Sequence, residues 1–153
     1  MRKTYIVLSL IAASCTLFIV ACKKKYISSR HGESKSHKQG LLCITCHSPN
    51  ASAKQVYTVG GTVFDEVRLN AQPKAIVKLY TKAGAQGKLV ATLRTDDLGN
   101  FYTNKEIDFS KGLYPTLLGT PGVKDDTKHM PKPIFIGDCN RCHGLNTESL
   151  GIN

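Results

Sequence analysis

Two copies of one five-residue pattern carry the most specific chemistry in the sequence. Residues 43–47 are Cys-Ile-Thr-Cys-His, and residues 139–143 are Cys-Asn-Arg-Cys-His. This spacing is the attachment signature of c-type haem, because two thiols three positions apart can each add to one vinyl group of the haem edge. The histidine beside the second cysteine is then held under the iron as the proximal axial ligand. The predicted attachment cysteines are Cys43, Cys46, Cys139 and Cys142, and the predicted proximal ligands are His47 and His143.

The use of cysteine along the chain favours two covalent haem c groups. Of six cysteines, four lie in the two motifs, whereas Cys15 and Cys22 lie within and at the end of the N-terminal apolar run. No cysteine is left for a structural disulfide after export. A four-cysteine zinc site is the competing interpretation. A histidine follows both pairs, 92 residues separate them, and the chain carries an export signal, so haem is the stronger prediction.

The first 21 residues have the pattern of a signal peptide. Arg2 and Lys3 form a basic start, and an apolar run follows over residues 6–20. This run is about 15 residues long, whereas a membrane-spanning helix needs about 20. A retained membrane anchor is therefore the weaker alternative, and export is the prediction.

The end of the apolar run resembles the lipobox of bacterial lipoproteins, since residues 19–22 are Ile-Val-Ala-Cys. In that family the signal is cut before the cysteine, which then carries the acyl chains. The resemblance implies that Cys22 is lipidated, and two or three acyl chains give stable anchoring. It also implies an exported protein anchored in the outer membrane, facing the periplasm or the cell surface.

The charge of the chain is strongly positive. The formal net charge is +10, and removing residues 1–21 leaves 19 basic and 11 acidic residues, or +8. Nucleic acid is discounted as a partner, because the chain has an export signal and no nucleic-acid motif. The basic surface is either a solvated face or a means of steering towards an acidic redox partner or an anionic lipid surface.

Composition divides the chain into five segments. The segment after the signal is rich in lysine and serine with little apolar content, which is typical of a flexible tether. A long region with short β-type runs separates the two motifs, and the region before the second motif is rich in glycine and proline. The predicted division is 1–21 signal peptide, 22–40 lipidated tether, 41–55 first haem segment, 56–118 β-sandwich, and 119–153 loop and second haem segment.

The central region carries strand patterns separated by turn signals. Residues 56–64 have strand composition with a glycine bulge, and residues 76–80 are β-branched and aromatic. Residues 89–94 alternate between apolar and other side chains, the pattern of a half-buried strand. A turn over residues 96–100 leads to a further strand. Short strands at these intervals predict a mainly β fold, a small antiparallel β-sandwich flanked by two irregular haem c-binding segments.

Two resemblances extend this prediction. Residues 61–65, 75–80, 90–96 and 99–101 resemble the carboxypeptidase-regulatory-like, or prealbumin-like, seven-stranded sandwich over about 60 residues. Such domains are mostly non-catalytic scaffolds. The order of motif, sandwich and motif is similar to small dihaem c-type cytochromes from bacteria that respire with external electron acceptors. This second resemblance implies an electron carrier whose partners are redox proteins or extracellular electron acceptors.

Three histidines and one methionine remain as candidates for the distal axial position. His37 lies six residues before the first motif, and six extended residues reach about 20 Å, enough to pass from one face of a haem to the other. In the resembling cytochromes a histidine at this offset often binds iron. His129 and Met130 precede the second motif, and the sequence does not separate them. His31, in the same tether as His37, is expected to be a bystander.

Three functions from different classes fit these features. An electron carrier with two six-coordinate irons is the main prediction, so the chain is not expected to be an enzyme. A haem enzyme with one open iron, such as a peroxidase, is the second, and a zinc-stabilised adhesion or sugar-binding sandwich is the weakest. A homo-oligomer or filament, in which a histidine of one subunit caps a neighbour's haem, stays open.

Overall fold

The computed structural model describes residues 25–65, 70–119, 126–144 and 150–152, the last three by their backbone. Within these ranges the chain is mainly β with two four-residue helices, which confirms the predicted fold class at this level. The elements in chain order are α2 (Cys43–Cys46), β1 (Val59–Asp65), β2 (Ile76–Lys82), β3 (Gln86–Arg94), β4 (Asn100–Thr103), β5 (Tyr114–Leu118), β6 (Thr127–His129), α3 (Asn140–His143) and β7 (Leu150–Ile152). No helix in these ranges is long and apolar enough to cross a membrane.

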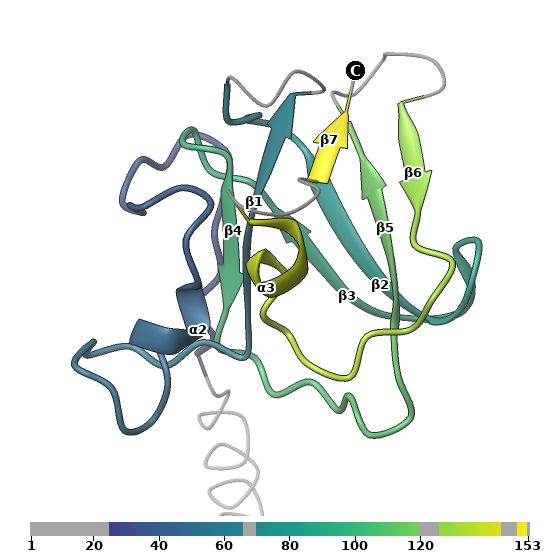
Figure 1. Cartoon of the computed structure of the whole chain (residues 1–153), viewed down its shortest axis with the longest axis horizontal. Helices are drawn as coiled ribbons and strands as arrows, with labels where there is room; N and C mark the ends of the chain where they lie inside the picture. Colours follow the sequence, from purple (N-terminus) through teal and green to yellow (C-terminus); the bar gives the residue numbers. More distant parts are fainter. Residues whose placement is uncertain (1–24, 66–69, 120–125, 145–149, 153) are drawn as a thin grey trace, which may run out of the picture.

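The strands form two sheets. One sheet has the strand order β4-β1-β7 and the other has the order β3-β2-β5-β6 (Figure 1). Pairing is antiparallel throughout the larger sheet and between β1 and β4, as predicted, whereas β7 runs parallel to β1. Because β1 is the central strand of the smaller sheet, both of its edges and both of its faces are covered.

A single hydrophobic core joins the two sheets. Alternate residues along a strand point to one face, so Val59 and Val63 of β1 enter the same core as Val77 and Leu79 of β2. Phe101 of β4 is fully buried in it. The core therefore lies against the face of β1 that carries the odd-numbered residues, and the even-numbered residues face the other way.

The segment predicted as a flexible tether differs from that prediction. Residues 27–40, here called the strap, lie along β4 and are held by short polar side chains. The Ser29 N–H donates to the Tyr102 carbonyl at 3.0 Å, and the Tyr102 N–H donates to Ser29 Oγ at 2.9 Å. Ser29 Oγ also donates to the Arg94 carbonyl at 2.7 Å. Hydrogen bonds hold the strap in place although it has little apolar surface to bury.

The regions around the second motif also contain structure that the sequence pattern did not indicate. Residues 127–129 form β6 beside β5, and residues 150–152 form β7 beside β1, where irregular loop was predicted. Both strands are three residues long, too short for an alternating pattern to be recognised. The predicted turn at residues 96–100 is present, since Asp96 Oδ1 accepts hydrogen bonds from the N–H groups of Leu98 and Asn100.

Candidate functional site

Each Cys-x-x-Cys-His motif forms a single helical turn. The N–H of His47 donates to the carbonyl of Cys43 at 3.0 Å, and the N–H of His143 donates to the carbonyl of Cys139 at 3.1 Å. Residues three and four positions apart lie on one side of such a turn. Both thiols and the histidine of each motif are therefore presented together, and all four thiols are free.

Both turns contact β1 at two successive glycines (Figure 1). A Cβ atom on Gly60 would lie 2.7 Å from Cys43 Cβ, and one on Gly61 would lie 2.9 Å from Cys139 Cβ. Successive residues of a strand point to opposite sides, so Cys43 and Cys139 approach β1 from opposite faces. The chain that enters the second motif also pairs with β1, through hydrogen bonds from the Gly60 N–H to the Gly137 carbonyl and from the Cys139 N–H to the Gly60 carbonyl. The predicted glycine bulge is absent from the β1–β4 pairing, whose register is continuous from Val59 to Thr62. The glycine pair instead permits close approach of both cysteine turns.

Asn140, inside the second motif, connects the two turns. Its side chain is only 3 % exposed. Its Oδ1 accepts the N–H of Thr62 at 2.9 Å, and its Nδ2 donates to the carbonyl of Leu41 at 2.8 Å. The same Nδ2 lies 4.0 Å from Cys43 Sγ. The second motif is therefore bonded directly to the chain that enters the first.

The first motif opens onto a cavity of about 310 Å³ on the outer face of the smaller sheet. Cys43, Cys46, His47 and the candidate ligand His37 all line it. His47 Nδ1 lies 2.8 Å from the Gln55 carbonyl. A carbonyl only accepts hydrogen bonds, so Nδ1 carries the proton and the lone pair of the neutral imidazole is on Nε2. This arrangement is the one that orients a histidine for a metal ion.

The two histidines of this cavity lie close together. The ring centroids of His37 and His47 are 5.9 Å apart, and the rings are tilted by 38°. The other side of His47 is covered by Tyr57, whose ring stacks on it at 4.2 Å, and Tyr102 stacks on Tyr57 at 4.7 Å. The stack restricts the plane of the His47 imidazole, and both His37 and His47 line the cavity.

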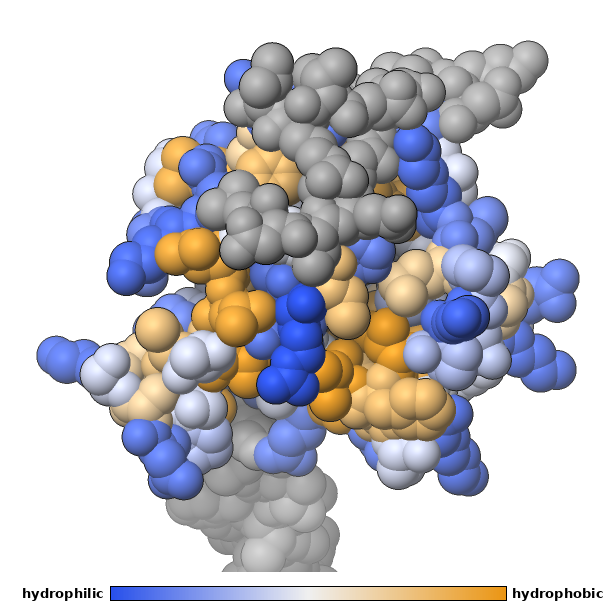
Figure 2. Space-filling model, viewed as in Figure 1, coloured by the Kyte–Doolittle hydropathy of each residue, from blue (hydrophilic) through white to orange (hydrophobic). Residues whose placement is uncertain are grey.

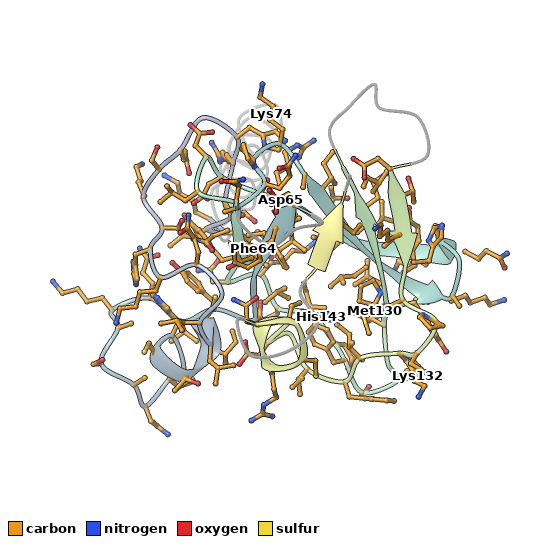
Figure 3. All side chains as sticks on the ribbon, turned by 45° about the horizontal axis from the view of Figure 1, so that its top comes forward. Phe64, Asp65, Lys74, Met130, Lys132 and His143 are labelled. Carbon is orange, nitrogen blue, oxygen red and sulfur yellow. The ribbon has the colours of Figure 1, made fainter. Side chains whose placement is uncertain are left out.

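The second motif opens onto a cavity of about 230 Å³ beside the larger sheet. Both remaining candidate ligands line it, so it brings together Cys139, Cys142, His143, His129 and Met130. Figure 3 shows Met130 and His143 close together in that view. The other lining residues are mostly apolar: Val77, Pro115, Leu117, Ile134, Ile136, Lys128 and Asp138.

Apolar surface surrounds the entrance to this second cavity. Figure 2 shows hydrophobic residues gathered over the chain that leads from β6 to α3. Within that chain Phe135 is 60 % exposed and Ile136 is 45 % exposed. Thr116 Oγ1 lies 3.0 Å from His129 Nδ1 and fixes the position of that ring. His129 and Met130 are neighbours on the wall of one cavity, and the structure does not separate them.

The first cysteine of each motif is held as a neutral thiol. Burial, followed by the nearby Asp138 carboxylate, raises the pKa of Cys43 to about 11. The same two causes raise the pKa of Cys139 to about 12. Burial also raises the pKa of Asp138, and Arg141 acts in the opposite direction. The surroundings of Cys43 and Cys139 therefore favour an uncharged sulfur at both residues.

The remaining predicted residues lie elsewhere. His31 Nδ1 lies 2.7 Å from the Thr95 carbonyl, and His31 lines neither cavity. Cys22 lies outside the described residues. Within the described ranges, no group of three or more His, Cys, Asp or Glu side chains could hold a metal ion.

Three residues of the site had no signal in the sequence. Asn140 occupies a variable position of its motif, Gln55 ends the first haem segment, and Tyr57 is predicted only as part of a strand. Their roles depend on contacts that only the folded chain brings about. The chemistry of the motifs and the geometry around them carry the assignment of roles, because no family model, curated protein or solved structure matches this chain.

Proposed function

We propose that the chain binds two covalent haem c groups and works as an electron-transfer protein. The observation that carries the proposal is the placement of two Cys-x-x-Cys-His turns on opposite faces of β1, at Gly60 and Gly61. Each turn opens onto a cavity that also holds a further candidate iron ligand. Haem c supplies an iron that changes oxidation state by one electron, at a potential set by its axial ligands and surroundings.

The geometry of the first cavity fits a metal between two imidazoles. Metal–imidazole nitrogen bonds are about 2 Å long, so two rings on opposite sides of one metal have centroids about 6 Å apart. The rings of His37 and His47 are 5.9 Å apart. The Gln55 carbonyl, by holding the proton on Nδ1, leaves His47 Nε2 to face the metal. His37 is the distal ligand in this proposal, and two imidazoles favour a lower potential than a His/Met pair.

The mostly apolar lining of the second cavity would give a bound haem an apolar environment. His143 would be the proximal ligand, and His129 or Met130, which line the same cavity, would be the distal one. Apolar walls exclude water and lower the local dielectric constant, which is one of the means by which a protein tunes a potential.

The placement of the two turns favours electron exchange between the groups. Neighbouring Cα atoms of a chain are about 3.8 Å apart, so the two cysteine turns contact β1 at adjacent positions, Gly60 and Gly61. The two packed sheets, a prealbumin-like sandwich in this proposal, provide a rigid mount. With both irons six-coordinate, the protein is a carrier and not an enzyme, and its partners are redox proteins or extracellular acceptors.

A lipid anchor on Cys22 would hold this domain close to the membrane. Ile27 is already bonded to the folded domain, since its N–H donates to Asn104 Oδ1 at 2.7 Å. Four residues lie between Cys22 and Ile27, and a fully extended chain reaches about 17 Å over the five residue steps that join them. In this proposal the exported protein stands near the outer membrane, so its redox partners must approach that surface.

Carbon monoxide binding tests the carrier proposal against the enzyme alternative. The exported chain is purified, reduced with dithionite and mixed with carbon monoxide while its visible spectrum is recorded. Two six-coordinate irons predict a low-spin spectrum that carbon monoxide leaves unchanged. Rapid binding by wild-type protein would indicate an open iron and would favour a peroxidase-like enzyme.

A further inference from the structure

We propose that a buried polar network of Asn100, Thr62 and Asn140 positions His37 opposite His47 and makes the second motif a structural part of the first site. The inference rests on the proposed function, because it treats His37 as an iron ligand. The three network residues are positioning residues, since the hydrogen bonds that they form with the strap and with the two motifs involve neither imidazole ring. Their effect is exerted through the backbone of the strap and of the first motif.

Thr62 is the centre of the network and is fully buried. Its Oγ1 donates to Asn100 Oδ1 at 2.6 Å and accepts the N–H of Gly40 at 2.9 Å and Asn140 Nδ2 at 3.2 Å. A hydroxyl has one proton to donate and two lone pairs, so the hydrogen-bonding capacity of this hydroxyl is fully used. A buried network in which every group is satisfied specifies one arrangement of the segments that it joins.

The Asn100 end of the network holds the strap around His37. Asn100 Nδ2 donates to Ser36 Oγ at 2.8 Å and to the His37 carbonyl at 3.5 Å. After His37 the chain turns sharply at Lys38, whose φ of 54° is a conformation that residues with a side chain rarely adopt. Beyond that turn the N–H of Gly40 is bonded to Thr62. The backbone is therefore fixed on both sides of His37.

The Asn140 end of the network joins the second motif to the first. Asn140 Oδ1 accepts a hydrogen bond from the backbone N–H of Thr62. Asn140 Nδ2 donates a hydrogen bond to the carbonyl of Leu41, two residues before Cys43. Thr62 and Asn140 are 78 positions apart in the sequence and Leu41 and Asn140 are 99 apart, so these bonds form only in the folded chain. A change at Asn140, within the second motif, is thus expected to alter the ligation of the first.

A matched pair of substitutions at Thr62 tests what its hydroxyl group contributes. Thr62→Val keeps the shape and the β-branch that suit a strand, whereas Thr62→Ser keeps the hydroxyl. Both variants are made as haem-loaded, exported chains. Carbon monoxide uptake by the reduced protein is measured beside wild type, His37→Ala and the Thr62→Val/His37→Ala double variant. Amide hydrogen exchange at Gly40 is measured by NMR or by mass spectrometry of its peptide.

The inference predicts that Thr62→Val gains one carbon monoxide site per chain over wild type, as His37→Ala does, and that the double variant gains no more than either. It also predicts about tenfold faster exchange at Gly40 in Thr62→Val than in Thr62→Ser, the scale expected for losing one hydrogen bond. Asn140→Leu is expected to show the same gain, and Arg141→Ala, an exposed neighbour in the same motif, is expected to show none.

Carbon monoxide uptake in Thr62→Val equal to that of wild type, or a gain that adds to the gain of His37→Ala, would overturn the positioning role. A wild-type chain without haem would instead overturn the proposed function. In that case the exchange rate at Gly40 would still decide whether the network holds the strap, since that measurement does not depend on iron.

Discussion

Substituting the two glycines of β1 one at a time is expected to disturb the two motifs separately. In Gly60→Ala the new Cβ would lie 2.7 Å from Cys43 Cβ. Carbon atoms in contact are about 3.5–4.0 Å apart, so the first turn must move by about 1 Å. In Gly61→Ala the new Cβ would lie 2.5 Å from the Phe101 ring and 2.9 Å from Cys139 Cβ.

The two clashes differ in how easily they are relieved. Phe101 is fully buried in the core and has no room to move, whereas Cys43 belongs to a turn on the outer face. Overpacking costs about 1–3 kcal/mol, and replacing a strand glycine by alanine recovers about 0.5–1 kcal/mol. Gly61→Ala is therefore expected to lose about 1–2 kcal/mol of unfolding free energy, or about 3–8 °C in Tm. Gly60→Ala is expected to lose less.

Haem occupancy of each motif is the assay that separates the two effects. Tryptic peptides that contain residues 43–47 or 139–143 are weighed with and without attached haem, and Tm is measured by circular dichroism. Gly60→Ala is expected to lower occupancy mainly at the first motif, and Gly61→Ala mainly at the second, with a smaller effect at the other motif through Asn140. Equal losses at both motifs in both variants, or unchanged occupancy and Tm in both, would refute the opposite-face arrangement.

Three further predictions concern the axial ligand, the buried thiols and the anchor. His37→Ala is expected to open the first iron to carbon monoxide. His31→Ala is expected to leave carbon monoxide uptake unchanged, because the His31 ring contacts the Thr95 carbonyl. A gain in uptake in the His31 variant alone would show that His31, and not His37, is the distal ligand. In the chain made without haem, the pKa values of Cys43 and Cys139 in the folded state lie above their unfolded value of 9.0. The folded state therefore keeps both thiols protonated at a pH where the unfolded chain has lost those protons. The free energy of unfolding falls as pH rises from about 9 towards 11 and 12. The loss is about 2–3 kcal/mol between pH 8 and pH 10, measured by urea unfolding, and it should vanish in the haem-loaded chain, whose thioethers do not titrate. Cys22→Ser is expected to release the exported protein from the membrane fraction and to remove the acyl mass, and an unchanged membrane fraction would contradict lipidation at Cys22.

The structural features that can be predicted from the sequence depend on residues close together in the chain. The motif spacing depends on one helical turn, and the alternation of β3 depends on one strand, so both are predictable. The alternation holds from Ala91 to Arg94 only, because Leu89 is 45 % exposed and Val90 packs against the core. The strap was predicted as a tether because its composition is polar. Its bonds to Tyr102 and Arg94 involve segments more than 60 positions away, which composition does not indicate.

The same reasoning explains what was missed around the motifs. A glycine pair in a strand permits a bulge or a close approach, and only the positions of Cys43 and Cys139 decide between them. His37 was predicted as a ligand from its offset to the first motif, but its distance to His47 depends on the strap and on Thr62. The role of Asn140 cannot be predicted from the motif, because its hydrogen-bond partners lie far away in the sequence and meet it only in the folded chain.

A pyridine haemochrome assay combined with intact mass on the exported chain tests the central claim most directly. The account predicts two haem c groups per chain, both retained under denaturing conditions because thioether bonds hold them to the two motifs. A colourless chain, or a mass without two attached macrocycles, would contradict it.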